Sequence, residues 1–168
     1  MTVSELIRTK RAVRQFTDEP LSEEAIRSIL NAGRRAQSSK NTQPWHFIAI
    51  RDRATLRQLS QCGAYAGHLA GATFAVALIA STPDSFDLGQ AAASMQLAAW
   101  ELGIGSCIAS IYEPEKAKAI LGVPHDLYFD VAISFGYPLP SREQSRTPKP
   151  NGRKPFDEVV FWERWVDK

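Results

Sequence analysis

The chain has 168 residues, of which 44% are hydrophobic and 23% are charged, and its formal net charge is +2. This composition is typical of a globular protein and excludes a disordered or fibrous chain. The length predicts one domain, residues 1–168, whose core needs no disulfide or metal to be stable. The balanced charge argues against a nucleic-acid partner, because proteins that bind a phosphate backbone usually show a broad basic face.

Cysteine usage and hydropathy indicate a cytoplasmic protein with no membrane partner. Cys62 and Cys107 are the two cysteines, too few for a disulfide framework, and no secretory signal precedes the first predicted helix. The longest apolar run, Leu69–Ala80, is shorter than the roughly 20 residues that a membrane-spanning helix needs.

Capping residues and apolar spacing predict the elements of the first half. Thr2 and Glu5 have the spacing of a capping box, which predicts a short first helix that ends near Lys10–Arg14. Ser22 precedes two glutamates and an apolar stripe at helical spacing, so it predicts the start of a second helix. A strand, a short helix and a strand buried on both faces follow, at Trp45–Ile50, Asp52–Cys62 and Thr73–Ala80.

Helices and strands alternate in the predicted second half. The alanine-rich stretch 84–102 predicts a central helix that allows close packing, and Pro114 and Gly122 bound another helix. This half is predicted to contain helices at Asp84–Leu102 and Glu113–Leu121 and strands at Ser106–Ile111 and Tyr128–Phe135. Helices come first and strands are mixed with helices later, so we expect an α+β fold around one central sheet.

The composition changes after residue 138. Residues 139–155 are rich in proline and basic residues, and a loop of this length in a compact domain is usually functional or disordered. Residues 156–168 are expected to form an apolar C-terminal extension that docks on another surface. The alanine-rich helix and this extension both need cover, which either a second copy of the chain or folding of the extension over its own chain would supply.

Several common catalytic patterns are absent. Gly103-Ile104-Gly105 lacks the third glycine of a dinucleotide fingerprint, and the chain has no P-loop. Ser106 is not in a nucleophile elbow, and the three histidines are too far apart in sequence to predict a metal site. Cys107 begins an apolar strand, so we interpret it as a core residue rather than a nucleophile.

Two polar stretches remain as candidates for function. Residues 8–14 carry four cations, and arginine offers a fork of donors that matches phosphate oxygens. Ser38–Phe47 is a polar loop that leads into a strand, as a heteroaromatic ligand with many hydrogen-bonding edges requires. Taken singly, cations at a helix end are usually solvated and serine-rich loops are usually turns. The order and spacing of the two stretches together favour a functional interpretation.

Read together, Lys10–Phe16 and Ser38–Phe47 resemble the FMN-dependent nitroreductase family, as a short single-domain member. The family pattern is an R-x-S-x-R-x-F-like segment, a helix, and then S-S-x-N-x-Q-P-W-x-F, and Ala12 replaces the usual serine here. This resemblance implies an α+β nitroreductase-like fold, in which helices flank a central mixed, mostly antiparallel sheet. It also implies an intertwined homodimer with FMN at the subunit interface, and NADH or NADPH as the reductant.

The resemblance further implies which residues hold FMN. The cations of 10–14 would hold the phosphate and ribityl end, with Arg153 and Lys154 returning to the phosphate, and Ala12 would offer its backbone amide. The 38–43 loop would contact the flavin, often from the neighbouring subunit, and Ile108–Ser110 would border the isoalloxazine ring. The implied cofactor-binding residues are Lys10, Arg11, Ala12, Arg14, Ser38, Ser39, Asn41, Gln43, Ile108, Ala109, Ser110, Arg153 and Lys154.

The implied activity is that of an FMN-dependent NAD(P)H oxidoreductase. It would reduce flat, electron-poor acceptors such as nitroaromatics, quinones or enones by ping-pong hydride transfer through flavin N5. FMN carries this chemistry, so no catalytic side chain is expected. Two alternatives stay open. One is a flavin-consuming or reductive-dehalogenating relative on the same scaffold, and the other is a non-enzymatic dimeric module that binds a partner through its basic loop 139–154.

Overall fold

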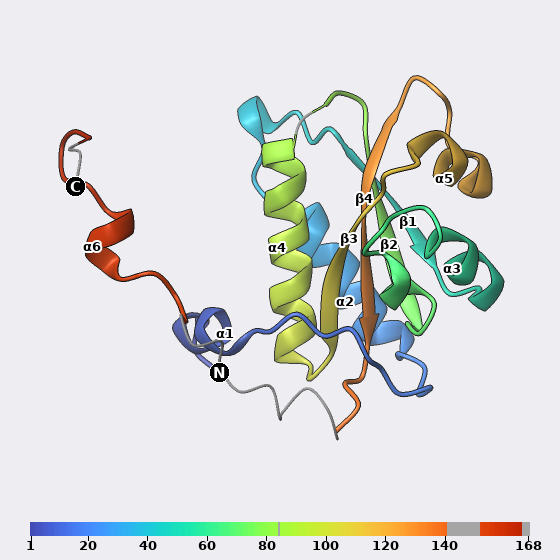
Figure 1. Ribbon diagram of the computed structural model, residues 1–168, viewed down its shortest axis with the longest axis horizontal. Helices are drawn as coiled ribbons and strands as arrows, with labels where there is room; N and C mark the ends of the chain where they lie inside the picture. The colour runs from blue at the N-terminus through green and yellow to red at the C-terminus, as the bar shows by residue number, and fades with distance from the viewer. Residues whose placement is uncertain (84, 141–151, 166–168) are drawn as a thin grey trace.

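A four-stranded sheet forms the centre of the molecule in a computed structural model that describes residues 1–83, 85–140 and 152–165 (Figure 1). Its strand order is β1-β2-β4-β3, and each of these pairings is antiparallel. The strands are β1 (Trp45–Ile50), β2 (Phe74–Ala80), β3 (Gly105–Ser110) and β4 (Tyr128–Gly136). The helices are α1 (Val3–Thr9), α2 (Glu23–Arg34), α3 (Arg53–Leu59), α4 (Ser85–Glu101), α5 (Pro114–Leu121) and α6 (Phe156–Val159), with short 3-10 helices η1 (Ser39–Asn41) and η2 (Gly67–Leu69). The predicted α+β class is confirmed.

Helices begin where the sequence predicted their caps. Thr2 Oγ1 accepts a hydrogen bond from Glu5 N at 3.3 Å, and Glu5 Oε2 accepts one from Thr2 N at 2.8 Å, which completes a capping box. Ser22 and Asp52 cap α2 and α3, each accepting from the amide three residues later, at 3.1 and 2.7 Å. These bonds satisfy amides at the helix starts that have no partner within the helix.

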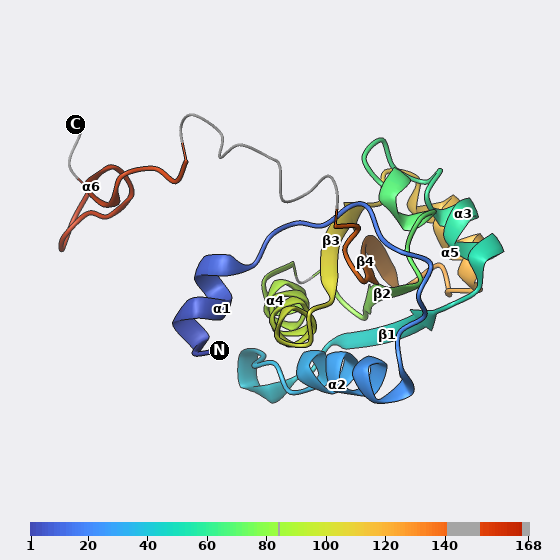
Figure 2. The same cartoon turned by 90° about the horizontal axis from the view of Figure 1, so that it is seen from below.

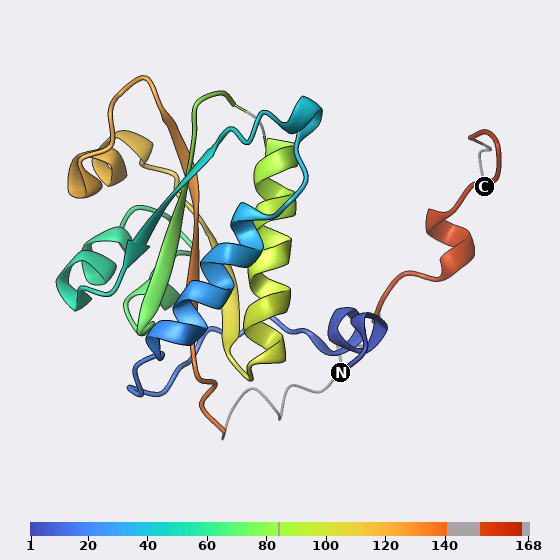
Figure 3. The same cartoon turned by 180° about the vertical axis from the view of Figure 1, so that it is seen from behind.

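Two layers of helices cover the sheet. Helices α2 and α4 pack on one face, in front of the sheet in Figure 3, and α3, η2 and α5 pack on the other (Figures 1 and 2). Strand β2 is buried along its whole length, which confirms the prediction of burial on both faces. Its side chains alternate between the two apolar clusters, with Phe74, Val76, Leu78 and Ala80 on the α2–α4 side and Ala75, Ala77 and Ile79 on the other.

The segment that follows α1 crosses the start of β3. Ala12 forms a parallel bridge with Ser106, and Val13 N donates to Ser106 O at 2.9 Å. Gly105 makes this close approach possible, because a Cβ on Gly105 would lie 2.5 Å from Val13 Cβ. Figure 2 shows the segment running from α1 across β3 toward the far end of the sheet. Residues 10–14 are therefore attached to the strand that the sequence placed beside the cofactor.

Residues 152–165 extend away from the body of the molecule in all three ribbon views (Figures 1, 2 and 3). They contain α6 and two strongly exposed tryptophans, Trp162 at 72% and Trp165 at 74%. Most of the predicted basic loop, residues 141–151, and the end of the predicted extension, residues 166–168, lie outside the described residues. Across the described ranges, no helix has the length and apolar character needed to cross a membrane.

Candidate functional site

Lys10 is the most buried cation of the 8–14 cluster and contacts the central helix. Its Nζ donates to Gln96 Oε1 at 3.4 Å, and Gln96 Nε2 donates to Ser106 Oγ at 3.2 Å. Burial lowers the pKa of Lys10, the nearby Cys107 raises it, and the positive charge of Arg153 lowers it further. Arg153, which is far away in sequence, therefore lies within electrostatic range of Lys10.

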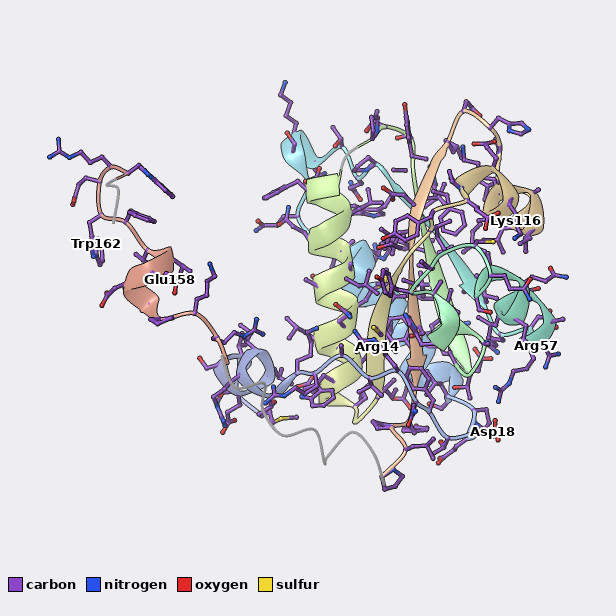
Figure 4. The ribbon with its side chains drawn as sticks, in the orientation of Figure 1. Arg14, Asp18, Arg57, Lys116, Glu158 and Trp162 are labelled. Carbon is purple, nitrogen blue, oxygen red and sulfur yellow. The ribbon has the colours of Figure 1, made fainter. Side chains whose placement is uncertain are left out.

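The two arginines of the segment have different surroundings. Arg11 Nη1 donates to the carbonyl oxygens of the last residues of α1, at 2.9–3.1 Å, and so caps that helix. Arg14 lies near β3 (Figure 4) and faces a cavity of about 450 Å³. This cavity, which we call the Arg14 cavity, is lined by Arg14, Gln15, Phe16, Gly67, His68, Gly71 and Leu139.

His68 forms a buried wall of the Arg14 cavity. Its Nδ1 lies 2.7 Å from Ser134 Oγ, which donates its own proton to Cys107 O at 3.3 Å. We therefore assign Nδ1–H as the donor to Ser134 Oγ, which leaves Nε2 as a bare acceptor in the neutral ring. Nε2 is buried and has no hydrogen-bond partner among the described residues. Burial lowers the pKa of His68, the Ile108 carbonyl raises it, and the charge of Arg14 lowers it again.

A buried neutral histidine should make folding depend on pH. Since the folded pKa of His68 is lowered from its ordinary value, the unfolded chain binds more protons below about pH 6.5. The free energy of unfolding should therefore fall as the pH drops from 7 toward 5, by up to about 1.4 kcal/mol per pH unit. Urea titrations of the apoprotein check this slope. His68→Asn should flatten it, whereas the same change at the exposed His46 should leave it unchanged.

The second predicted stretch forms η1 and its flanks, at the start of α4. Ser39 N donates to the buried carboxylate of Asp87 at 3.0 Å, and Gln43 N donates to Ser38 Oγ at 2.9 Å. The backbone is left-handed at Lys40, Asn41 and Gln43, with φ of 49°, 57° and 48°. Left-handed residues other than glycine are uncommon outside sites that hold them in place. The Asp87 contact is therefore expected to fix this loop.

Asp87→Ala should release the loop. The substitution removes the acceptor of Ser39 N–H, which would make the exposed Lys40 a better trypsin site. We expect cleavage after Lys40 to become several-fold faster, measured by mass spectrometry well below the unfolding temperature. Asp87→Asn keeps an acceptor oxygen and should stay close to the wild-type rate. Equal cleavage rates in the two variants would contradict this role of Asp87.

The two predicted stretches do not meet within one chain. Lys10 reaches α4 at Gln96, and Ser39 reaches it at Asp87, so the two contacts lie about 14 Å apart along the helix axis. Figure 2 shows α4 between the 10–14 segment, which follows α1, and η1. A ligand beside Arg14 is thus separated by a helix from the loop residues of the same chain.

Strand β3 is an edge of the sheet, and its side chains alternate in exposure. Ile108 is 47% exposed and Ser110 is exposed, whereas Ala109 is fully buried on the opposite face. Ile108 also lines an apolar hollow of about 370 Å³ against β2, β4 and α4. A larger open groove, of about 960 Å³, lies between α2 and β1; it includes Gln43 but none of residues 10–14. We place the candidate site at β3, because the buried polar groups gather there.

Four polar residues that contact or surround the two predicted stretches were missed in the sequence analysis. All four are buried, and each is a polar residue within an element that is otherwise apolar or rich in small residues. A polar residue in an otherwise apolar stretch of sequence could have indicated these positions, since buried polar side chains need hydrogen-bond partners. The four are His68, Asp87, Gln96 and Ser134.

Similarity to known proteins agrees with this geometry. The family model described as the nitroreductase family matches residues 7–72 and 77–137. The chain belongs to the nitroreductase family. The matched residues include both stretches on which the resemblance was recognised, so that recognition is confirmed.

Individual nitroreductase relatives align over most of the chain. A relative in Archaeoglobus fulgidus, provisionally named as an NADH dehydrogenase/NAD(P)H nitroreductase, is 34% identical over 82% of this chain and 86% of its own length. The 5,6-dimethylbenzimidazole synthase of Rhodospirillum rubrum is 27% identical over 89% of this chain and 92% of its own. Among solved structures, an FMN-dependent nitroreductase from Clostridium difficile superimposes with a TM-score of 0.83 at 27% identity, covering 95% and 98% of the two chains.

Proposed function

We propose that the chain is an FMN-dependent NAD(P)H oxidoreductase that reduces flat, electron-poor acceptors such as nitroaromatics, quinones or enones. One observation carries the proposal: the 10–17 segment docks on β3, which places the guanidinium of Arg14 at a cavity beside an exposed strand edge. Membership of the nitroreductase family and the names of the Archaeoglobus and Clostridium relatives support the same activity.

The residues at β3 fit FMN in charge and in shape. Lys10, Arg14 and Arg153 supply positive charge for an anionic ligand, and Ala12 contributes backbone close to β3. At the strand edge, Ile108 offers an exposed apolar side chain to a flat ring and Ser110 an exposed polar one. The side chain of Ala109 is buried, so this residue can offer only its backbone. Arg11 and Lys154 are already engaged, with α1 carbonyls and with Glu158 at 2.9 Å, so their contribution is to the local field. When bound, FMN supplies the redox chemistry, and these residues orient it.

A second copy of the chain would complete the site. Because α4 separates Arg14 from the loop of its own chain, the proposed contacts of Ser38, Ser39, Asn41 and Gln43 come from the partner in a homodimer. Exposed apolar side chains on or next to α1, on α4 and on the C-terminal segment support such an assembly, since exposed apolar surface of this extent is uncommon on a monomer. They are Met1, Val3, Ile7, Phe86, Phe156, Val159, Trp162 and Trp165.

An absorbance spectrum tests the proposal directly. Protein purified with added FMN should show flavin bands at close to one per chain, and anaerobic NADH or NADPH should bleach them. Adding a quinone or a nitroaromatic should then restore the oxidised bands, as ping-pong transfer requires. A colourless protein that takes up no FMN would overturn the proposal, and comparing the two reductants shows which one the enzyme prefers.

A flavin-consuming enzyme is the second candidate. The Rhodospirillum relative favours it, since that protein is named as a synthase rather than a reductase and aligns over 89% of this chain. In that case the flavin bands would not return after reoxidation, and a fragment of the ring would accumulate. The third hypothesis is a non-enzymatic module that binds a partner through loop 139–154. It depends on residues that lie mostly outside the described ranges.

A further inference from the structure

We propose that His68 is the group that takes up a proton when the cofactor is reduced and gives it back on reoxidation. The inference rests on the proposed function and deepens it, since it assigns a charge-compensating role to a buried side chain at the same site. In the oxidised enzyme His68 is neutral, with Nε2 as a bare acceptor. In the reduced enzyme Nε2 carries a proton, and the ring bears a positive charge beside Arg14.

The hydrogen bonds around His68 prepare Nε2 for this role. Ser134 Oγ holds the ring through Nδ1, 2.7 Å away, and donates a hydrogen bond of its own to the backbone carbonyl of Cys107. Nε2 is therefore the one nitrogen that is available for a proton, and it is buried without a partner among the described residues. The carbonyl of Ile108 favours the protonated ring, because a carbonyl oxygen accepts from an N–H but repels a bare nitrogen. A buried acceptor without a donor is destabilising, and a proton on Nε2 removes that penalty.

The charges near His68 explain why its ring is neutral in the oxidised enzyme and protonated in the reduced enzyme. Among the described residues, Arg14 is the one formally charged side chain that lines the cavity, and it opposes protonation, as burial does. Two further groups act on the ring, the hydroxyl of Ser134 and the carbonyl of Ile108, and neither carries a net charge. A negative charge placed beside Arg14 offsets that cation, so the balance shifts toward the protonated ring.

In the proposed binding mode, the Arg14 cavity lies closer to the isoalloxazine ring of FMN than to its phosphate. Along the 10–14 segment, Lys10 and Arg11 lie at the end of α1, Ala12 bridges the start of β3, and Arg14 follows. His68 interacts with the carbonyl of Ile108, in the part of β3 assigned to the ring. The negative charge that appears at this point is therefore that of the reduced ring.

Electrons and protons balance in this scheme. Hydride transfer from NADH or NADPH brings two electrons and one proton to FMN and releases NAD⁺ or NADP⁺, which leaves the reduced ring with one negative charge. One further proton enters from solvent and binds His68 Nε2. Reoxidation by a two-electron acceptor removes the ring charge, and the proton leaves His68 with the product or returns to solvent.

Histidine NMR on the holoenzyme tests the proposal without any change at the site. The chain has three histidines, and His46 and His125 are exposed, so Gln variants of those two assign the signals. At pH 7, the ¹⁵N shifts of His68 should be those of a neutral ring in the oxidised protein and of an imidazolium after anaerobic reduction. The same neutral pattern in both states would overturn the proposal. Protonation already on binding oxidised FMN would also overturn it, since the charge beside Arg14 would then be the phosphate.

Proton uptake gives a second and independent readout. Reduction by NADH or NADPH in weakly buffered solution with a pH indicator should consume about one proton per flavin in the wild type. It should consume far less in His68→Asn, whose amide still donates to Ser134. His125→Asn is the matched control and should behave as the wild type. Uptake that is equal in all three proteins would contradict the role of His68. Absence of bound flavin would contradict the proposed function instead, so the two failures are distinguishable.

Discussion

Alanine in place of Gly105 should destabilise the protein by about 2–3 kcal/mol and weaken cofactor retention at the same time. The added Cβ would lie 2.5 Å from Val13 Cβ and 2.7 Å from both of its methyl groups. Valine is branched at this atom and cannot rotate out of the way. The 10–14 segment would have to lift off β3, which breaks the bond from Val13 N to Ser106 O.

Gly89→Ala is the matched control for this substitution. Gly89 lies inside α4, and a Cβ there meets nothing within 4 Å, so alanine should be neutral or stabilising by up to about 1 kcal/mol. Urea denaturation measures the stabilities, and dialysis followed by flavin absorbance measures the retained FMN. Equal stability of Gly105→Ala and the wild type would show that the segment does not need its close approach to β3.

Arg14→Ala should reduce FMN affinity by about 10- to 100-fold with little change in the unfolding temperature. A charge-assisted hydrogen bond to an anionic ligand contributes about 1.5–3 kcal/mol, and Arg14 is the charged residue that lines the cavity. Fluorescence titration of the apoprotein with FMN gives the affinity. Arg8→Ala removes an exposed charge from the last turn of α1 and should cost far less. Matching affinities for these two variants would remove Arg14 from the site.

Local chemistry predicted the elements well, but not their assembly. Thr2, Ser22 and Asp52 fixed helix starts because a cap depends on residues three positions apart. The apolar run at β2 predicted a strand covered on both faces for the same local reason. Its neighbours in the sheet, β1 and β4, were not predicted, since pairing depends on contacts between residues far apart in the chain.

The site was predicted in part for the same reason. The resemblance implied that the cations of 10–14 and residues 108–110 hold the same cofactor, but no local pattern shows that Gly105 accommodates Val13 or that Arg11 is occupied at the end of α1. His68 gave no signal of its own, because one histidine in a glycine- and alanine-rich stretch has no periodicity to interpret. Its partner Ser134 lies on a different strand and is brought close only by folding.

The position of α4 between Arg14 and the 38–43 loop has a consequence for handling the protein. A cofactor that contacts both must bind across two copies, so its binding and the association of the chains are linked by mass action. Dilution should therefore release flavin, and excess flavin should hold the copies together at concentrations where the apoprotein separates. The yellow colour of a sample would then report its protein concentration as well as its cofactor supply.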